Sequence, residues 1–193
     1  MARWDPDAGG RLQRAAIELF VQQGYATTTV PQIAARAGVT TRTYFRYFAD
    51  KREVLFAGED GLVTQFAELI GAAPPGLSAI ASLEHALTAA AEQAFEPRRE
   101  WMRRWRQIVT SEDALLERGL SKQQLMVRAA VEALGERGVD APTAELAAGM
   151  AFVAFQAAVA EWATATAARP LTAYLEDSFS RMHQVAAGDA GRA

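Results

Sequence analysis

The chain has 193 residues, of which 50% are hydrophobic, so it is long enough to bury a core in one large or two small domains. It contains no cysteine, which excludes disulfides and thiolate metal sites. The first residues lack the apolar core of a signal peptide. The longest apolar run, residues 147–155, is much shorter than the roughly 20 residues of a membrane span. We therefore expect a cytoplasmic protein with no membrane association.

The net charge of −3 conceals an uneven distribution along the chain. Residues 10–55 carry seven basic and three acidic side chains, a net charge of +4. Residues 56–193 carry 12 basic and 18 acidic side chains, a net charge of −6. A basic N-terminal region on an acidic body favours a polyanionic partner such as DNA, unless the asymmetry of so short a segment is chance.

Apolar residues recur at helical spacing almost throughout, which predicts an all-α fold. In the N-terminal region, one helix spans 11–23 and ends at Gly24. A second begins at the capping box formed by Thr29 and Gln32, and a third spans 41–48 after the N-cap residue Thr40. The later helices are expected at 50–70, 78–95, 98–110, 112–137, 143–168 and 171–186. We predict a three-helix helix-turn-helix DNA-binding domain over 1–55 and a C-terminal helical bundle domain over 56–193 for ligand sensing and dimerisation.

The second and third short helices fit a helix-turn-helix unit. Gly38 supplies the turn between them, and the small side chain of Ala34 allows the two helices to approach closely. The third helix would then lie in the major groove of DNA. Its exposed side chains suit this position, because arginine can form two hydrogen bonds to guanine and threonine can contact several base edges.

The same segment resembles the N-terminal signature of the TetR family of transcriptional regulators, over about residues 10–55. The matching residues are Gly24, Tyr25, Thr28, Thr29, Val30, Ile33, Ala34, Ala37, Gly38, Val39, Thr40, Thr43, Tyr44, Phe45, Arg46, Tyr47, Phe48 and Lys51. The resemblance implies a homodimer bound to a double-stranded DNA operator, with repression relieved by a small, mostly apolar ligand.

The resemblance also assigns roles to residues. Thr29 and Thr40 would bond phosphate or orient backbone N–H groups toward it, Lys51 would contact phosphate, and Arg42 and Arg46 would read bases. The full set of expected DNA contacts is Thr29, Thr40, Thr41, Arg42, Thr43, Arg46, Tyr47 and Lys51. We expect Tyr44 and Phe48 to belong to the core, while Tyr47 can either contact the groove or pack.

Two positions depart from the family pattern. The family usually has tyrosine at Phe45, where the hydroxyl commonly reaches a phosphate, and phenylalanine cannot make that contact. Pro31 stands where some members present a polar side chain to a base. We therefore expect this protein to read its site mainly from the third helix.

The segment 143–168 has two apolar stripes, which indicates burial on two faces. One stripe contains Leu146, Met150, Val153 and Ala157; the other contains Phe152, Phe155, Val159 and Trp162. Paired with the last helix across a two-fold axis, it would form a four-helix dimer bundle, as TetR-like proteins do. The expected interface residues, or the core just beneath them, are Phe155, Trp162, Leu175 and Phe179. The alternative is that both faces serve one monomeric core.

A small-molecule site is expected in the C-terminal region. Trp101 and Trp105 lie on one face of the helix 98–110, among several arginines. They suit either a pocket wall for an apolar, amphipathic or anionic ligand, or a core bordered by arginine side chains. The expected ligand residues are Phe66, Phe95, Trp101, Trp105, Met126 and Phe152. The helix from Lys51 to Ile70 is expected to be the only link between the domains and to transmit the ligand signal.

Nothing in the sequence supports catalysis. The two histidines, His85 and His183, lie far apart, and the common hydrolase, metalloprotease and nucleotide-binding motifs are missing from the sequence. We expect no enzyme activity, no catalytic residue, no metal and no cofactor. Two functions stay open: a repressor released from a palindromic operator by a small apolar ligand, or a dimeric DNA-binding regulator controlled by a protein partner.

Overall fold

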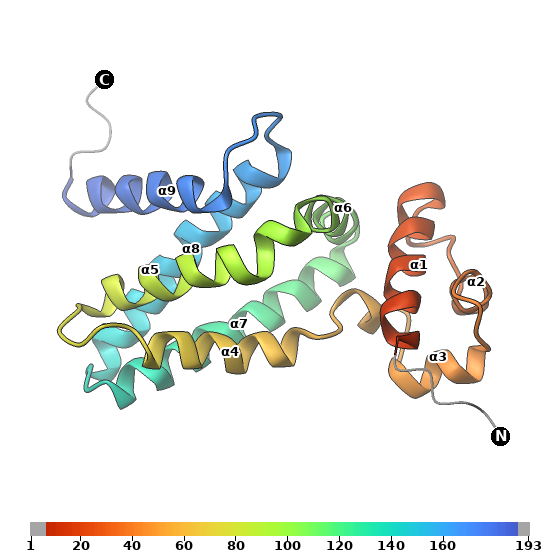
Figure 1. Ribbon diagram of the computed structural model, residues 1–193, viewed down its shortest axis with the longest axis horizontal. Helices are drawn as coiled ribbons and strands as arrows, with labels where there is room; N and C mark the ends of the chain where they lie inside the picture. The colour runs from red at the N-terminus through yellow and green to blue at the C-terminus, as the bar shows by residue number, and fades with distance from the viewer. Residues whose placement is uncertain (1–6, 189–193) are drawn as a thin grey trace. The chain divides into compact units, whose positions relative to one another are not determined.

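The computed structural model describes residues 7–188, and every regular element in this part of the chain is helical (Figure 1). This confirms the all-α prediction. The helices are grouped into two compact units. Unit 1 runs to Asp60 and also contains Arg104–Ser121, whereas unit 2 contains Gly61–Arg103 and the chain from Lys122 onward. The chain passes between the units three times, so the expectation of a single covalent link is wrong. The functional division at residue 55 stays a prediction.

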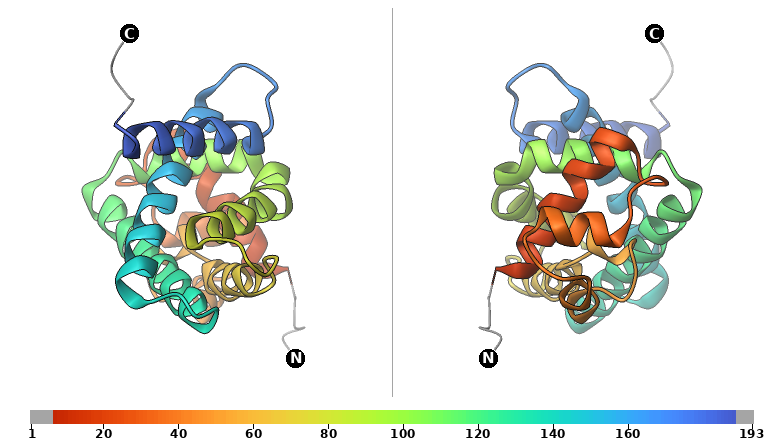
Figure 2. Two further views of the ribbon diagram at one scale, coloured as in Figure 1. Left: turned by 90° about the vertical axis from the view of Figure 1, so that its left-hand side faces the viewer. Right: turned by 90° about the vertical axis from the view of Figure 1, so that its right-hand side faces the viewer.

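The first three helices of unit 1 contact one another around a small core (Figure 2, right). They are α1 (Ala8–Gln23), α2 (Val30–Arg36) and α3 (Thr41–Tyr47). Gly38, with φ +70°, turns the chain between α2 and α3, a conformation that glycine adopts without steric cost. The buried side chains from these helices include Leu12, Ala16, Phe20, Ile33, Ala34, Tyr44 and Phe48. The three-helix prediction is confirmed, although α1 begins three residues earlier than expected.

The segment after α3 differs from its prediction. Instead of one helix over 50–70, the structure has a 3-10 turn, η1 (Glu53–Leu55), followed by α4 (Glu59–Gly71). Gly58, with φ +84°, interrupts the helix between them. The apolar residues of η1 are buried in unit 1, so they do not extend the apolar stripe of α4 as the periodicity suggested.

Two side chains from residues 104–121 hold the η1 turn within unit 1. Trp105 Nε1 donates a hydrogen bond to the Leu55 carbonyl oxygen at 2.9 Å. The Arg118 guanidinium donates to both Glu53 carboxylate oxygens, at 2.9 and 3.1 Å. The Arg118 and Glu53 side chains are each only about 30% exposed, so this bidentate ion pair is stronger than a fully solvated one.

Unit 2 is built around α5 (Ala79–Ala90), α8 (Ala141–Thr164) and α9 (Leu171–Ala186), which contact one another (Figure 2, left). A π-helix, η2 (Ala91–Phe95), and a 3-10 turn, η3 (Glu96–Arg98), follow α5. The helices α6 (Arg99–Val109) and α7 (Asp113–Glu136) each contribute residues to both units. The bounds of α9 agree with the prediction. The helix α8 starts two residues earlier than expected, because Asp140 caps it and Pro142 lies in its first turn. It ends four residues earlier than expected, at Thr164, where the backbone of Ala165 becomes extended.

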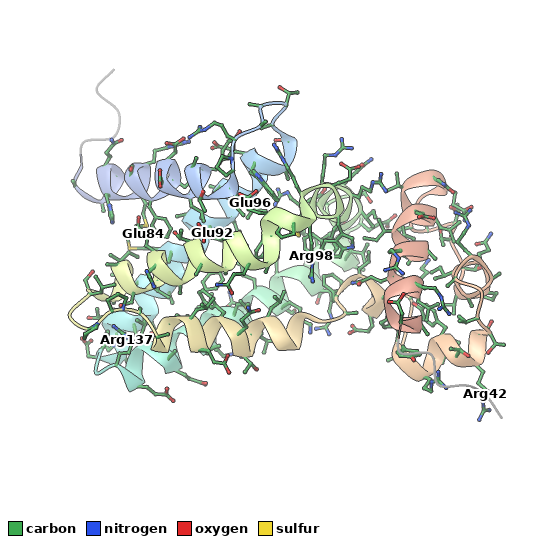
Figure 3. The ribbon with its side chains drawn as sticks, viewed as in Figure 1. Arg42, Glu84, Glu92, Glu96, Arg98 and Arg137 are labelled. Carbon is green, nitrogen blue, oxygen red and sulfur yellow. The ribbon has the colours of Figure 1, made fainter. Side chains whose placement is uncertain are left out.

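Loops in unit 2 are held by arginines that donate to backbone carbonyls. Arg99 Nη2 lies 2.9, 3.0 and 3.2 Å from the carbonyl oxygens of Trp162, Ala165 and Ala167, at the end of α8. Arg137, labelled in Figure 3, donates to three carbonyls of the loop after α4 at 2.8–3.2 Å. Cations placed at helix C-termini also interact favourably with the helix dipole.

The two apolar stripes of α8 have different environments. Phe152, Val159 and Trp162 are buried within the chain. In contrast, Leu146 and Val153 of the other stripe are each 67% exposed. Trp162, Leu175 and Phe179 are no more than 1% exposed, so they belong to the core of the single chain rather than to its surface. The stripe that contains Leu146 and Val153 is therefore the face of α8 that is available to a second protein chain.

One helix among the described residues is long and apolar enough to span a membrane by length and composition. This helix is α8, whose mean hydropathy over its most apolar window is 1.4. The sequence-based expectation had considered only the uninterrupted apolar run. Of the same window, 44% is buried inside the protein, and a single helix of this kind is weak support for a membrane span.

Candidate nucleic-acid interface

The start of α2 is fixed by the predicted capping box. Thr29 Oγ1 accepts a hydrogen bond from Gln32 N at 3.4 Å, and Gln32 Oε1 accepts one from Thr29 N at 2.8 Å. The preceding Thr28 is buried and donates from Oγ1 to the Gly24 carbonyl oxygen at 2.7 Å. These contacts fix the backbone at the beginning of α2, while the Thr29 side chain stays exposed.

The start of α3 has a second cap. Thr40 Oγ1 accepts from Thr43 N at 3.1 Å and lies 3.0 Å from Thr43 Oγ1. The Arg42 side chain is exposed and extends away from the ribbon of α3 (Figure 3). It forms no hydrogen bond or ion pair with the rest of residues 7–188. The first turn of α3 therefore presents an unpaired guanidinium group from a backbone that its cap holds in place.

The next turn of α3 carries a second exposed arginine. The Arg46 guanidinium lies 5.1 Å from the centre of the Tyr47 ring, and its Nη2 is 3.5 Å from the Tyr47 hydroxyl. Stacking on an aromatic ring limits the rotamers available to an arginine. Because residues 42 and 46 are four apart on the helix, both arginines project from the same face.

The opposite face of α3 is in the core, as predicted for Tyr44 and Phe48. Tyr44 is fully buried, and its hydroxyl donates to the Asp50 carbonyl oxygen at 3.1 Å. Burial, followed by the charge of Asp50, raises the Tyr44 pKa far above its ordinary value, so the hydroxyl remains protonated and can keep donating. Phe45 lies at the boundary between the two faces, where it is 55% exposed.

Lys51 is held inside unit 1. Its Nζ donates to the carbonyl oxygens of Tyr25 at 2.7 Å and Thr28 at 2.9 Å, and lies 4.1 Å from the centre of the Tyr25 ring. Burial lowers the pKa of Lys51, and the Glu112 carboxylate opposes that shift. The ammonium group fixes the turn that leads into α2. A role in phosphate binding would depend on its third N–H.

Sequence reasoning missed the side chains that position α3 and the turn after it. The Asp50 carboxylate accepts from the backbone nitrogens of Arg52 and Glu53, at 2.7 and 3.1 Å. Burial favours the protonated form, but these hydrogen bonds and the Arg52 guanidinium outweigh it and lower the Asp50 pKa. Asp50 was expected to begin a long helix, and instead its carboxylate accepts from the backbone where the short η1 turn begins. Lys51 bonds to Tyr25 and Thr28, which lie 26 and 23 positions earlier in the chain, so no local sequence signal indicates these contacts.

The expected ligand residues are only partly brought together. In unit 2, the Phe66 and Phe152 rings lie 5.5 Å apart, and the Phe95 ring lies 5.2 Å from that of Phe155. Phe152 and Phe155 are 6.4 Å apart, so the four rings form one cluster, which we call the phenylalanine cluster. Trp105 is not in this cluster but in unit 1, against Phe56. Trp101 and Met126 are in unit 2 and partly exposed.

Comparison with known proteins identifies the N-terminal region. Residues 12–57 match the family model described as bacterial regulatory proteins, tetR family. The HTH-type transcriptional regulator TcmR of Streptomyces glaucescens is 38% identical over 79 residues, which cover 41% of this chain and 35% of TcmR. Residues 12–57 therefore carry the sequence signature of the TetR family. The match to TcmR spans about a third of that protein's length.

Solved structures of TetR-family proteins resemble this one over most of its length. FadR of Thermus thermophilus, a TetR-family repressor in complex with lauroyl-CoA, is 22% identical, with a TM-score of 0.56 and coverage of 91% of this chain and 93% of that chain. SmeT is the repressor of a Stenotrophomonas maltophilia multidrug efflux pump. The structure of its complex with triclosan has 19% sequence identity to this chain, a TM-score of 0.61 and coverage of 90% of each chain. These likenesses confirm the TetR fold, with an N-terminal helix-turn-helix and a C-terminal helical domain. TcmR and FadR are both described as transcriptional regulators or repressors.

Proposed function

We propose that this protein is a TetR-family transcriptional repressor that binds a near-palindromic operator as a homodimer, in the cytoplasm. The observation that carries the proposal is the capped α3, which presents Arg42 and Arg46 on one exposed face within the segment that matches the family. Two copies of α3 related by a two-fold axis require half-sites whose centres lie about 34–36 Å apart, or a multiple of that distance.

The proposed DNA contacts divide into two kinds. Arg42 and Arg46 read base edges, assisted by Thr41, Thr43 and Tyr47 of the same helix. The exposed caps Thr29 and Thr40 contact phosphates or orient N–H groups toward them, and Lys51 contributes positive charge near the backbone. Selection of binding sequences from random duplexes tests the proposal directly, and recovery of no palindromic motif would refute it.

Replacement of Arg42 or Arg46 by alanine is expected to weaken operator binding by about 1–3 kcal/mol for each lost base contact. Binding to random DNA should fall much less, because a base contact contributes little there. Fluorescence anisotropy with operator and scrambled duplexes measures both quantities. The matched control is Arg103→Ala, which removes one positive charge from an exposed position in unit 2 and should leave operator affinity unchanged. Equal losses on both duplexes would contradict the base-reading role.

The Phe45→Tyr variant is expected to bind DNA more tightly than the wild-type protein. The added hydroxyl restores the group that, by resemblance to the family, reaches a phosphate, and a net gain of about 0.5–1.5 kcal/mol is typical of one hydrogen bond. The gain should be equal for operator and random duplexes, and the salt dependence should not change, because a neutral hydroxyl displaces no counterion. Phe45→Leu is the control, and an equal gain in that variant would refute the phosphate contact.

Dimerisation is proposed to use the exposed stripe of α8, together with the end of α9. Leu146 and Val153 on α8 and Val185 on α9 are 63–67% exposed, which is unusual for large apolar side chains gathered on neighbouring helices. A two-fold pairing of these faces would bury them in a four-helix interface. This assignment replaces the expectation based on Trp162, Leu175 and Phe179.

The proposed effector is a small, mostly apolar or amphipathic ligand that lowers operator affinity. Support comes from the phenylalanine cluster of unit 2 and from the lauroyl-CoA and triclosan bound by FadR and SmeT. Lauroyl-CoA and triclosan are therefore the first probes for operator release by anisotropy. A ligand that binds must favour the low-affinity state in order to shift the equilibrium. Typical coupling of about 1–3 kcal/mol would reduce DNA affinity by roughly 5–150-fold.

The signal cannot depend on one continuous helix from Lys51 to Ile70, because Gly58 interrupts it. The proposed route instead uses α6 and α7, which continue from unit 2 into unit 1. Their Trp105 and Arg118 bond the η1 turn that follows α3. The alternative, control by a protein partner, predicts that no small molecule releases the operator while the exposed apolar residues of α7, Leu116 and Leu120, bind another protein.

A further inference from the structure

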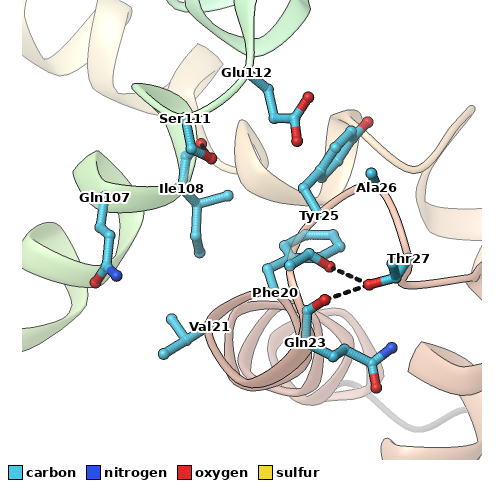
Figure 4. Close-up of a pocket in the computed structure, with 11 residues that line it drawn as sticks. Phe20, Val21, Gln23, Tyr25, Ala26, Thr27, Gln107, Ile108, Ser111 and Glu112 are labelled. Atoms are coloured by element: carbon cyan, nitrogen blue, oxygen red, sulfur yellow. Dashed lines mark hydrogen bonds between the residues drawn. The ribbon is translucent and has the colours of Figure 1, made fainter.

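A hollow of about 290 Å³ lies within unit 1, and no residue of α3 or of the phenylalanine cluster lines it (Figure 4). One wall is the turn after α1, Gly24 to Thr27. The opposite wall is the corner between α6 and α7, from Gln107 to Glu112. Nothing in the DNA-binding or sensing roles proposed above uses this hollow.

The floor of the hollow is apolar and well packed. Phe20 and Ile108 line it and are only 3% and 4% exposed, while Val21 at its edge is 42% exposed. The Phe20 and Tyr25 rings pack with their centres 5.0 Å apart at an interplanar angle of 56°. The turn itself is braced by Thr27, whose hydroxyl donates to the carbonyl oxygens of Gln23 and Gly24. The hollow is therefore a formed surface of rings and aliphatic groups.

The charge in this hollow comes from Glu112. Its carboxylate extends from the α6–α7 corner toward Tyr25 (Figure 4), and it forms no ion pair or hydrogen bond with the rest of the described chain. The Glu112 charge acts on Lys51 electrostatically, but the Lys51 ammonium donates to two backbone carbonyl oxygens and forms no hydrogen bond with Glu112. A carboxylate beside an apolar floor disfavours anions and favours a cation that can donate a hydrogen bond to it.

Tyr25 adds a polar group on the opposite wall, in the turn after α1. Burial raises its pKa, and the carboxylates of Asp50 and Glu112 contribute further, so its hydroxyl stays protonated near neutral pH. The hollow thus combines an apolar floor, one unpaired carboxylate and a hydroxyl group. Small-molecule sites usually have this composition, with a few polar groups that fix orientation.

We propose that this hollow binds a small organic cation, with an ammonium or amidinium group on Glu112 and an aromatic or branched body against Phe20, Val21 and Ile108. A volume of about 290 Å³ accommodates roughly ten non-hydrogen atoms, at the ~30 Å³ that a water molecule occupies in the liquid. The site is in the DNA-binding unit and adjoins the turn that ends at the Thr29 cap. It is separate from the effector site proposed for unit 2, and its occupancy does not depend on operator binding.

The test uses 2-phenylethylammonium as the probe and 2-phenylethanol as its neutral analogue, titrated into the full-length protein and followed by amide NMR shifts. We expect the cation to shift the amides of residues 24–27 and 107–112. Glu112→Gln keeps the shape of the side chain and should lower the affinity for the cation at least about fivefold, as expected for loss of a charge-assisted hydrogen bond. It should leave binding of the alcohol unchanged.

The matched control is Glu117→Gln, an exposed carboxylate one to two turns further along α7 that does not line the hollow. It should bind the cation as the wild-type protein does. A second variant, Ala26→Trp, fills the hollow from an exposed position and should abolish the shifts at residues 107–112. Equal affinity of the cation for wild type and Glu112→Gln, or shifts confined to other parts of the protein, would overturn the proposal.

Discussion

Glutamate in place of Val153 is expected to convert the proposed dimer into a folded monomer. Val153 is 67% exposed in the single chain, so the charge is tolerated there. Across a two-fold axis, the same charge would be buried twice and left unpaired, which costs roughly 3–5 kcal/mol for an uncompensated buried charge. Sedimentation should show a monomer at micromolar concentration, and operator affinity should fall with it, because one α3 reads only one half-site.

Two comparisons make this result specific to α8. Leu120→Glu places the same charge on α7, where the leucine is 52% exposed, and should leave the dimer intact. Leu175→Glu introduces the charge at a residue that is 1% exposed, so it should unfold the chain and reduce helical circular dichroism. A wild-type protein that is monomeric at micromolar concentration, or a Val153→Glu variant that stays dimeric, would contradict the proposed interface.

Alanine in place of Arg99 is expected to lower the free energy of unfolding by about 2–3 kcal/mol, since hydrogen bonds to charged groups contribute about 1.5–3 kcal/mol each. Arg99 Nη2 has two hydrogens, which three carbonyl oxygens at the end of α8 share. Its guanidinium also lies 5.4 Å from the centre of the buried Trp162 ring. Without the Arg99 side chain, the three carbonyl oxygens lose their hydrogen-bond donor, and water replaces that donor only in part. Thermal and urea unfolding measure the loss.

The control for Arg99 lies one turn further along the same helix. Arg103 pairs with Glu100 at 3.0 Å, but both side chains are more than half exposed. Solvated pairs of this kind contribute little, so Arg103→Ala should change stability by less than about 0.5 kcal/mol. If both variants unfold alike, the carbonyl contacts of Arg99 do not stabilise the loop as proposed.

Local sequence signals predicted the parts of the fold that depend on neighbouring residues. The capping box of Thr29 and Gln32, the turn at Gly38 and the last helix were all found from spacings of a few residues. The interruption at Gly58 was not predicted, because the apolar residues before and after it follow one helical spacing. In the structure, those before Gly58 belong to η1 and those after it belong to α4.

The faces of α8 could not be assigned from periodicity. Both stripes are apolar, and only the packing of α5 and α9 determines which one is buried. The contacts that fix the candidate interface also join distant residues. Lys51 reaches Tyr25 across 26 positions, and Arg118 reaches Glu53 across 65. Charge and residue type indicate that such side chains can pair but not which partners they choose.

The contribution of residues 104–121 to unit 1 has a consequence for how the protein is made. During synthesis, the first 60 residues leave the ribosome well before Trp105 and Arg118, which complete the bonds to the η1 turn. At about 5–20 residues per second, roughly 3–12 seconds separate the two events. Over that interval the nascent DNA-binding segment lacks these partners for Glu53 and Leu55. It therefore acquires its final form only after α5, α6 and the beginning of α7 have been translated.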